Sequence, residues 1–237
     1  MIHAFINKKV HLEKGYYEDV KTASIIGVLK NLPAQLFWEL IKNSCADNGK
    51  LPKNSGEIIS CEFWPRWTYK TPVEPDVFIR FEEFDLIIEA KREDKNGQCH
   101  GQWEREICAY FSAYNYSDSP KKNVILIALG GSSDMVYETI NTNIAIEDDA
   151  TQTISICINV FKCNWYTLLR NTSHLKEQMQ NQRYWDSNRI SLIRLLEDVI
   201  TAFNYQGLYD IDWLESISCK GNTINEDSIR VFNDWKI

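Results

Sequence analysis

Two acidic side chains and a lysine are spaced in this sequence so that a simple β-hairpin would bring them together. The segment from Val73 to Lys91 contains two runs rich in Val, Ile and Phe, which is typical of short strands joined by a tight turn. If the chain reverses between Glu82 and Glu83, residues whose numbers sum to 165 face each other. Asp76 then lies opposite Glu89, with Cβ atoms about 5 Å apart.

This pairing predicts a site for a divalent cation, because such ions prefer oxygen ligands and two carboxylates would converge there. Side chains two residues apart on a strand share a face, so Lys91 places its ammonium beside Glu89. The register is an inference, since Glu-Glu is a poor two-residue hairpin turn. A longer loop of even length about the same centre would preserve it.

The same residues resemble a known signature. Pro75-Asp76, followed after a hairpin-length gap by Glu89-Ala90-Lys91, is similar to the motif of the PD-(D/E)XK, or restriction-endonuclease-like, nuclease superfamily. The resemblance singles out no subfamily. It implies an α/β fold with a mixed sheet and an αβββαβ core, and a nuclease that requires Mg²⁺ or Mn²⁺. It also implies roles for the motif residues: metal ligands in Asp76, Glu89 and the carbonyl of Ala90, and a water-orienting, charge-stabilising Lys91.

A third carboxylate heads a predicted helix that precedes the hairpin. Residues 15–32 have helical periodicity, and Glu18 lies in line with Ile25 and Leu29 on a largely apolar stripe. In the superfamily a helix at this place often supplies a glutamate to the metal cluster. The resemblance therefore assigns this role to Glu18, with Asp19 as the substitute candidate. The alternative is an exposed glutamate in the first turn, favoured by the helix dipole.

Another helix is predicted from Gln102 to about Tyr114, after the charged loop that follows the hairpin. Several branches of the superfamily carry a glutamine near the active site on the helix after the catalytic strand. Gln102 is a candidate catalytic residue by this resemblance. The spacing from Gln102 to the next tyrosine differs from the Gln-x-x-x-Tyr motif of the RecB-like branch, so the resemblance does not extend to that branch. The alternative interpretation is that Gln102 is an ordinary residue of the first helical turn.

The remaining periodicity predicts one α/β core with a helical extension. Further strands are expected at residues 57–63, 123–129 and 153–161, and further helices at 35–43, 135–141, 165–180 and 186–205. The continuous apolar run at 123–129 is typical of a strand buried on both faces. We therefore divide the chain into a nuclease-like core, residues 1–163, and a C-terminal helical region, residues 164–237, packed on or extending that core.

Four residues near the hairpin are candidates for contact with nucleic acid. The run from Trp64 to Lys70 alternates aromatic and cationic side chains, and such side chains stack on unpaired bases and hold phosphates. The candidates are Arg66, Trp67, Lys70 and Arg92. An aromatic cover over one edge of the sheet is at least as good an interpretation of this run.

The composition indicates a globular protein without a membrane span. The 237 residues are 44% apolar and 12% aromatic, which is ample for a packed interior. No apolar run approaches the roughly 18 residues of a membrane-spanning helix, and Met1 to Lys9 lacks the apolar segment of a signal peptide. Seven cysteines without a Cys-x-x-Cys motif argue against a disulfide framework and a zinc site. We expect reduced thiols and a cytoplasmic location.

The net charge of −7 limits the kind of nucleic-acid binding to expect, because phosphate contacts supply most of the affinity. Residues 61–120 carry 7 Lys and Arg against 12 Asp and Glu. The acidity is thus concentrated partly where a bound cation would offset it. Tight nonspecific binding to duplex DNA is not expected.

These observations predict a metal-dependent nuclease that hydrolyses phosphodiester bonds, with a DNA endonuclease of the restriction or phage-defence type as the favoured member of this class. A homodimer is one oligomeric state compatible with the sequence. One alternative is a catalytically silent module of the same fold that binds nucleic acid or a protein partner; the intact Asp76, Glu89 and Lys91 disfavour it. A chance motif in an unrelated α/β protein and a different class of hydrolase are two further possibilities.

Overall fold

A computed structural model describes residues 18–93, 97–114, 122–146, 149–181 and 187–210 of the chain. Within these ranges the protein is a mixed α/β structure, as the sequence predicts, and its helices pack on both faces of a six-stranded sheet. None of the helices in these ranges is both long and apolar enough to cross a membrane.

The strands and helices have the following bounds. The main sheet contains β1 (Ile58–Phe63), β4 (Val77–Phe81), β5 (Phe84–Ala90), β6 (Asn123–Leu129), β7 (Glu138–Ile146) and β8 (Asp149–Cys163). A separate hairpin is formed by β2 (Trp67–Tyr69) and β3 (Thr71–Val73). The α-helices are α2 (Glu18–Leu29), α3 (Ala34–Ser44), α4 (His100–Ala113), α5 (Trp165–Asn181) and α6 (Ser187–Tyr205). A single 3₁₀ turn covers Asn48–Lys50.

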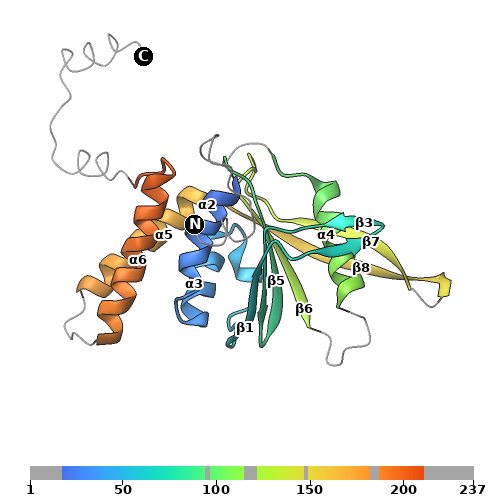
Figure 1. Ribbon diagram of the computed structural model, residues 1–237, viewed down its shortest axis with the longest axis horizontal. Helices are drawn as coiled ribbons and strands as arrows, with labels where there is room; N and C mark the ends of the chain where they lie inside the picture. Colours follow the sequence, from blue (N-terminus) through green and yellow to red (C-terminus); the bar gives the residue numbers. More distant parts are fainter. Residues whose placement is uncertain (1–17, 94–96, 115–121, 147–148, 182–186, 211–237) are drawn as a thin grey trace, which may run out of the picture.

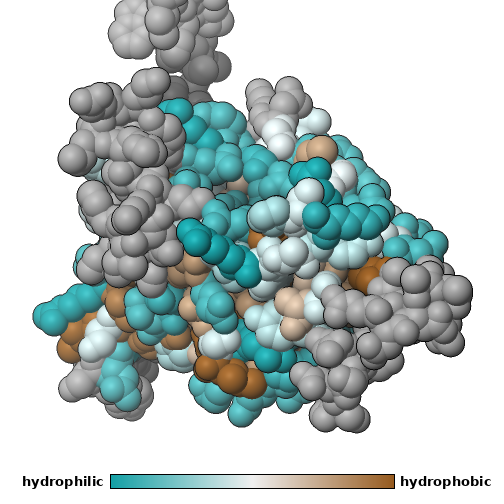
Figure 2. All heavy atoms as spheres, turned by 45° about the vertical axis from the view of Figure 1, so that its right-hand side comes forward, coloured by the Kyte–Doolittle hydropathy of each residue, from teal (hydrophilic) through white to brown (hydrophobic). Residues whose placement is uncertain are grey.

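The sheet has the strand order β1-β4-β5-β6-β8-β7. Its central pairs, β5 with β6 and β6 with β8, are parallel, whereas the outer pairs are antiparallel. Helices α2, α3, α5 and α6 lie on one side of the sheet, and α4 lies on the other side with the β2–β3 hairpin (Figure 1). The side with α4 is mostly hydrophilic in its described part, with hydrophobic groups in small separate spots (Figure 2).

The hairpin has the register that the sequence predicts. The four paired positions of β4 and β5 run from Val77 opposite Ile88 to Arg80 opposite Asp85, and each pair sums to 165. Extension of this register by one position brings Asp76, which directly precedes β4, level with Glu89. Both acids therefore lie at the same end of the hairpin.

The unfavourable Glu-Glu turn is held by the segment that precedes β1. The amide of Glu82 donates to the carbonyl of Glu57 at 3.0 Å, and that of Glu83 donates to the carbonyl of Ser55 at 3.2 Å. The carboxylate of Glu82 also accepts a hydrogen bond from the Glu57 amide at 3.0 Å. Contacts distant in sequence therefore stabilise a turn that its own two residues do not favour.

Strand β5 is buried along its whole length and divides the core into two parts. Leu86, Ile88 and Ala90 pack in the cluster on the side of α2, α3, α5 and α6, whereas Ile87 packs in the cluster beneath α4. This alternation is the two-residue period of a strand. It directs Glu89 to the α4 side, where Ile87 also points.

Helix α2 is more enclosed than an amphipathic surface helix. Its buried residues include Lys21 and Ser24 as well as the apolar stripe. The Lys21 ammonium donates to the carbonyl of Arg92 at 2.6 Å, and the Ser24 hydroxyl donates to the carbonyl of Val20 at 2.5 Å. These bonds satisfy polar groups that would otherwise be costly to bury.

The expected helix at residues 135–141 is wrong. This part of the chain enters β7, which pairs with the long β8 along its whole length. From Thr139 to Ile144 exposed and buried residues alternate, with Ile140, Thr142 and Ile144 buried. A period of two is the pattern of a strand, and the β-branched residues here favour the same structure.

The C-terminal helices share a core with the sheet. Trp165 and Leu168 of α5 and Phe203 of α6 belong to the same buried cluster as the apolar residues of α2 and α3. The boundary expected between residues 163 and 164 coincides with the change from β8 to α5. Residues 211–237 of the proposed C-terminal region lie outside the described part of the chain.

Because Leu86 is fully buried in the middle of β5, we expect Leu86→Ala to lower the free energy of unfolding by about 2–5 kcal/mol. Ile59 on the edge strand β1 is 61% exposed and provides the control. Ile59→Ala should change the free energy of unfolding by less than about 0.5 kcal/mol. Urea unfolding followed by circular dichroism measures both, and equal losses would contradict the assignment of β5 to the core.

Candidate metal centre

Three carboxylates from separate parts of the chain meet at one end of the hairpin. Glu18 begins α2, Asp76 directly precedes β4, and Glu89 is the penultimate residue of β5. One oxygen from each lies within 4.8 Å of the other two. The structure thus brings together the three acids that the sequence singles out, and their all-oxygen donor set is the one that Mg²⁺ and Mn²⁺ prefer.

Asp76 is held rigidly by two hydrogen bonds. One carboxylate oxygen accepts the amide of Ala90 at 2.8 Å, and the other accepts the indole N–H of Trp64 at 3.2 Å. The amide of Trp64 donates in turn to the carbonyl of Asp76 at 3.0 Å. The amide of Ala90 thus positions the aspartate, whereas the expected role of the Ala90 carbonyl as a metal ligand stays a prediction.

Glu89 is positioned by two residues that the sequence also singles out. The Lys91 ammonium forms a short ion pair with the Glu89 carboxylate and lies 3.3 Å from that of Glu18. The side-chain amide of Gln102, on the first turn of α4, donates to the same Glu89 oxygen at 2.6 Å. Gln102 therefore reaches the acidic cluster, as the resemblance implies.

The backbone around Lys91 is fixed by residues that sequence reasoning did not assign. The indole N–H of Trp165, the first residue of α5, donates to the Lys91 carbonyl at 2.6 Å. Gly130 and Gly131 have φ angles of +72° and +67°. A Cβ on Gly130 would lie 2.6 Å from the Lys91 carbonyl oxygen, and one on Gly131 would lie 2.7 Å from Lys91 Cβ. Glycine is required here by both the conformation and the close approach.

Gln98 and Trp103 complete this support. The Gln98 amide donates to the carbonyl of Glu89 at 3.0 Å and to that of Gly130 at 3.1 Å. The indole N–H of Trp103 holds the Gln98 side-chain oxygen at 2.8 Å. Gln98, just before α4, therefore bonds both the end of β5 and the glycine turn after β6.

A fourth carboxylate lies behind the first three. Glu106, one turn after Gln102 on α4, is 1% exposed, and its carboxyl group is within hydrogen-bond reach of Glu89. Sequence reasoning gave it no role. Glu106 follows Gln102 by one helical turn and is in line with Ala109 and Ala113, and a glutamate on such a stripe of small residues is the signal that would have identified it.

Burial makes this cluster costly to ionise. Burial, the charge of Glu89 and the charge of Glu18 raise the pKa of Asp76 well above its usual range, although the Ala90 amide and Lys91 oppose the rise. Burial and the charge of Glu106 raise the pKa of Glu89 to about 8. Burial likewise raises the pKa of Glu106 to about 7. A bound cation would favour the ionised forms of these acids.

Lys91 responds in the opposite way. Burial disfavours its ammonium, but the charges of Glu89, Glu18 and Asp76 outweigh this effect and raise its pKa. Lys91 is therefore a cation near neutral pH in the metal-free protein. It stabilises negative charge in this state rather than accepting a proton.

The four candidates for contact with nucleic acid have different surroundings. The indole of Trp67 is buried against Phe78, Tyr110 and Tyr114, so it forms the aromatic cover that was the alternative interpretation. This burial leaves no face of Trp67 open for stacking on a base. The remaining candidates, Arg66, Lys70 and Arg92, are exposed.

Each of these exposed cations has an acidic or aromatic neighbour, which for Arg92 is Glu93 at 3.5 Å. Arg66 lies 3.6 Å from Glu74, and the Lys70 ammonium lies 5.2 Å from the ring of Tyr69. Arg92 is closest to the acidic cluster, since its amide donates to Glu18 at 3.0 Å. It is the candidate best placed to contact a phosphate bound there.

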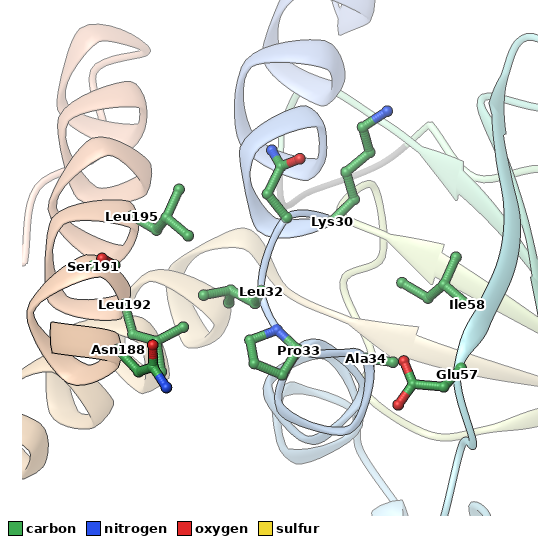
Figure 3. Close-up of a pocket in the computed structure, with 11 residues that line it drawn as sticks. Lys30, Leu32, Pro33, Ala34, Glu57, Ile58, Asn188, Ser191, Leu192 and Leu195 are labelled. Atoms are coloured by element: carbon green, nitrogen blue, oxygen red, sulfur yellow. The ribbon is translucent and has the colours of Figure 1, made fainter. Parts of the chain in front are cut away.

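A hollow of about 510 Å³ lies elsewhere, between the α2–α3 turn, the start of β1 and α6 (Figure 3). Leu32 and Pro33 line one side of it, and Leu192 and Leu195 line another. No member of the acidic cluster contributes to its wall. The hollow is therefore separate from the candidate metal centre.

The raised pKa values of Glu89 and Glu106 predict that the metal-free protein loses stability as the pH rises from about 5 to about 8. In this window the unfolded chain has already released these protons, while the folded chain still holds them, so deprotonation favours unfolding. Urea unfolding in EDTA at several pH values measures the slope. Glu106→Gln should flatten it, whereas Glu83→Gln at the exposed hairpin turn should not. If the free energy of unfolding of Glu106→Gln depended on pH as strongly as that of the unchanged protein, the raised pKa of Glu106 would be contradicted.

Comparison with known proteins adds no family to this description. The chain matches no protein-family model, and no curated protein sequence matches it. The superfamily resemblance therefore stays a prediction, which depends on the residues of the acidic cluster and on their arrangement.

Proposed function

We propose that the protein is a divalent-metal-dependent nuclease that hydrolyses phosphodiester bonds. The observation that carries this proposal is the convergence of Glu18, Asp76 and Glu89 within 4.8 Å, with the Lys91 ammonium in contact with two of them. Phosphodiester hydrolysis needs an activated water and stabilisation of negative charge in the transition state. Acidic ligands for a metal and an adjacent cation supply these requirements.

In this proposal each residue of the cluster has a distinct task. Asp76 and Glu89 hold Mg²⁺ or Mn²⁺, Glu18 completes or extends the ligand set, and the bound metal supplies Lewis-acid stabilisation and activates water. Lys91 orients the water and stabilises the charge that develops on the phosphate. Gln102 keeps the Glu89 carboxylate in place through its hydrogen bond of 2.6 Å.

We propose DNA as the substrate. Arg92 is exposed and adjacent to Glu18. Arg66, which directly precedes β2, and Lys70, in the turn between β2 and β3, are also exposed. Cations at these places would hold DNA phosphates. Because the net charge is −7, we propose that DNA binds mainly through the metal at the acidic cluster and not through broad nonspecific contacts with the surface. We also propose a cytoplasmic location, which the free thiols of the described cysteines support.

Removal of the central charged groups should abolish cleavage. We expect Asp76→Asn and Lys91→Met to lower the cleavage rate by at least about 100-fold, because each group supplies several kcal/mol of transition-state stabilisation. The assay uses supercoiled plasmid, linear duplex and single-stranded DNA, with Mg²⁺, Mn²⁺ or EDTA. Glu83→Gln and Lys53→Met, matched exposed changes near the hairpin turn, should retain the rate of the unchanged protein.

The outcomes of this assay separate the proposed function from its alternatives. Cleavage that survives Asp76→Asn and Lys91→Met would exclude this site as its source. DNA binding without cleavage in all metals would favour the silent binding module. Neither binding nor cleavage would favour a chance motif.

A further inference from the structure

Two cysteines that are far apart in the sequence face each other where the end of α3 meets the sheet. Cys45 directly follows α3, and Cys163 is the last residue of β8. The two residues form an isolated antiparallel bridge, and each carries its thiol. Both side chains are buried in the cluster on the side of α2, α3, α5 and α6, so they point to the same side of the backbone.

The backbone hydrogen bonds around the bridge indicate how close the two cysteines lie. The amide of Ala46 donates to the carbonyl of Lys162 at 3.0 Å, and the carbonyl of Cys163 accepts the amide of Gly130 at 2.7 Å rather than that of Cys45. Facing residues of an antiparallel pair that do not bond each other have Cα atoms about 4.5 Å apart. A disulfide joins Cα atoms roughly 4.4–6.8 Å apart. The fold therefore holds this pair at a separation that a disulfide can span.

Three other described cysteines have different surroundings. Cys61 of β1 faces Ile79, and Cys157 of β8 faces Asn141. Cys108 of α4 is buried, and its sulfur lies 3.6 Å from a threonine hydroxyl of β7. A cysteine opposite a cysteine is thus a property of the bridge at the end of α3 and not of these three positions.

We propose that Cys45 and Cys163 are a site of reversible oxidation, at which a peroxide converts the two thiols into a disulfide. Cys45 is 6% exposed and Cys163 is 1% exposed, so Cys45 reacts first. Its sulfur takes one oxygen of the peroxide and becomes a sulfenic acid, while the other oxygen leaves as water. The sulfur of Cys163 then forms the S–S bond and displaces a second water, so that two electrons pass from the thiols to the peroxide. Thiol reductants reverse the reaction by exchange.

The disulfide fastens α3 to the backbone that supports the candidate metal centre. The amide of Gly130, bonded to the Cys163 carbonyl, belongs to the glycine turn that packs against Lys91. Trp165, two residues after Cys163, donates to the Lys91 carbonyl. The bond also closes a long loop of chain, which restricts the unfolded state and so stabilises the fold. The competing explanation is that both cysteines are core residues that stay reduced while the chain is folded.

Peptide mapping of the full chain tests this site. The folded protein is treated with hydrogen peroxide in EDTA, the remaining thiols are alkylated in denaturant, and trypsin is added. Cleavage after Lys and Arg places Cys45 in the peptide 43–50 and Cys163 in the peptide 163–170, each with one cysteine. We expect both alkylated peptides to be lost and replaced by one cross-linked species, lighter than their sum by two hydrogens, which dithiothreitol separates. Recovery of both peptides in alkylated form, or linked to other cysteines, would overturn the inference.

A pair of variants and an unfolding measurement separate this bond from nonspecific oxidation. Cys163→Ala should abolish the cross-link, whereas Cys108→Ala, at a buried cysteine that contacts a threonine, should retain it. The urea midpoint of the unchanged protein should rise on oxidation, and that of Cys163→Ala should not. A midpoint that falls as the cross-link forms would show that the fold does not accommodate the bond, which would also overturn the inference.

The mapping of the unchanged chain needs no variant to fold, and it does not depend on the proposed nuclease function. A chain that forms this disulfide and cleaves no DNA retains the oxidation site and loses the function. A chain that cleaves DNA and keeps both thiols retains the function and loses the oxidation site.

Discussion

The hydrogen bond from the Ala90 amide to the Asp76 carboxylate, 2.8 Å long, is the interaction on which the site depends. The backbone pairs of β4 and β5 extend only as far as Val77 and Ile88. Beyond them a side-chain oxygen takes the place of a backbone acceptor. The bond therefore continues the hairpin by one step and holds an aspartate, rather than a carbonyl, against the end of β5.

This arrangement concentrates negative charge in a buried place. Glu89 and Glu106 are almost fully enclosed, and their raised pKa values express the cost of ionising them there. Lys91 offsets part of that charge and remains an ammonium as a result. The same burial that makes these acids costly to ionise would strengthen their attraction for a cation, since the low dielectric enhances both effects.

Helix α5 contributes to the site as well as to the core. Trp165 bonds the Lys91 carbonyl, and the Lys21 ammonium lies 4.7 Å from the Trp165 ring while it donates to the Arg92 carbonyl. Helices α2 and α5, far apart in sequence, thus meet at the backbone of Lys91 and Arg92. The glycines at 130 and 131 allow this close approach.

The sequence by itself determined the hairpin and the identity of its charged groups, because strand periodicity and the symmetry of a reversal are local properties. The resemblance to the nuclease superfamily implied that Glu18 and Gln102 lie near the acidic pair, and both side chains do lie beside Glu89. Tertiary structure alone decided the burial of Glu106, the contact of Trp165 with Lys91 and the packing of Trp67, since each depends on surfaces far apart in the chain. Strand β7 combines both kinds of information. The alternation of polar and apolar residues is visible in the sequence, but the pairing with β8 makes this segment a strand.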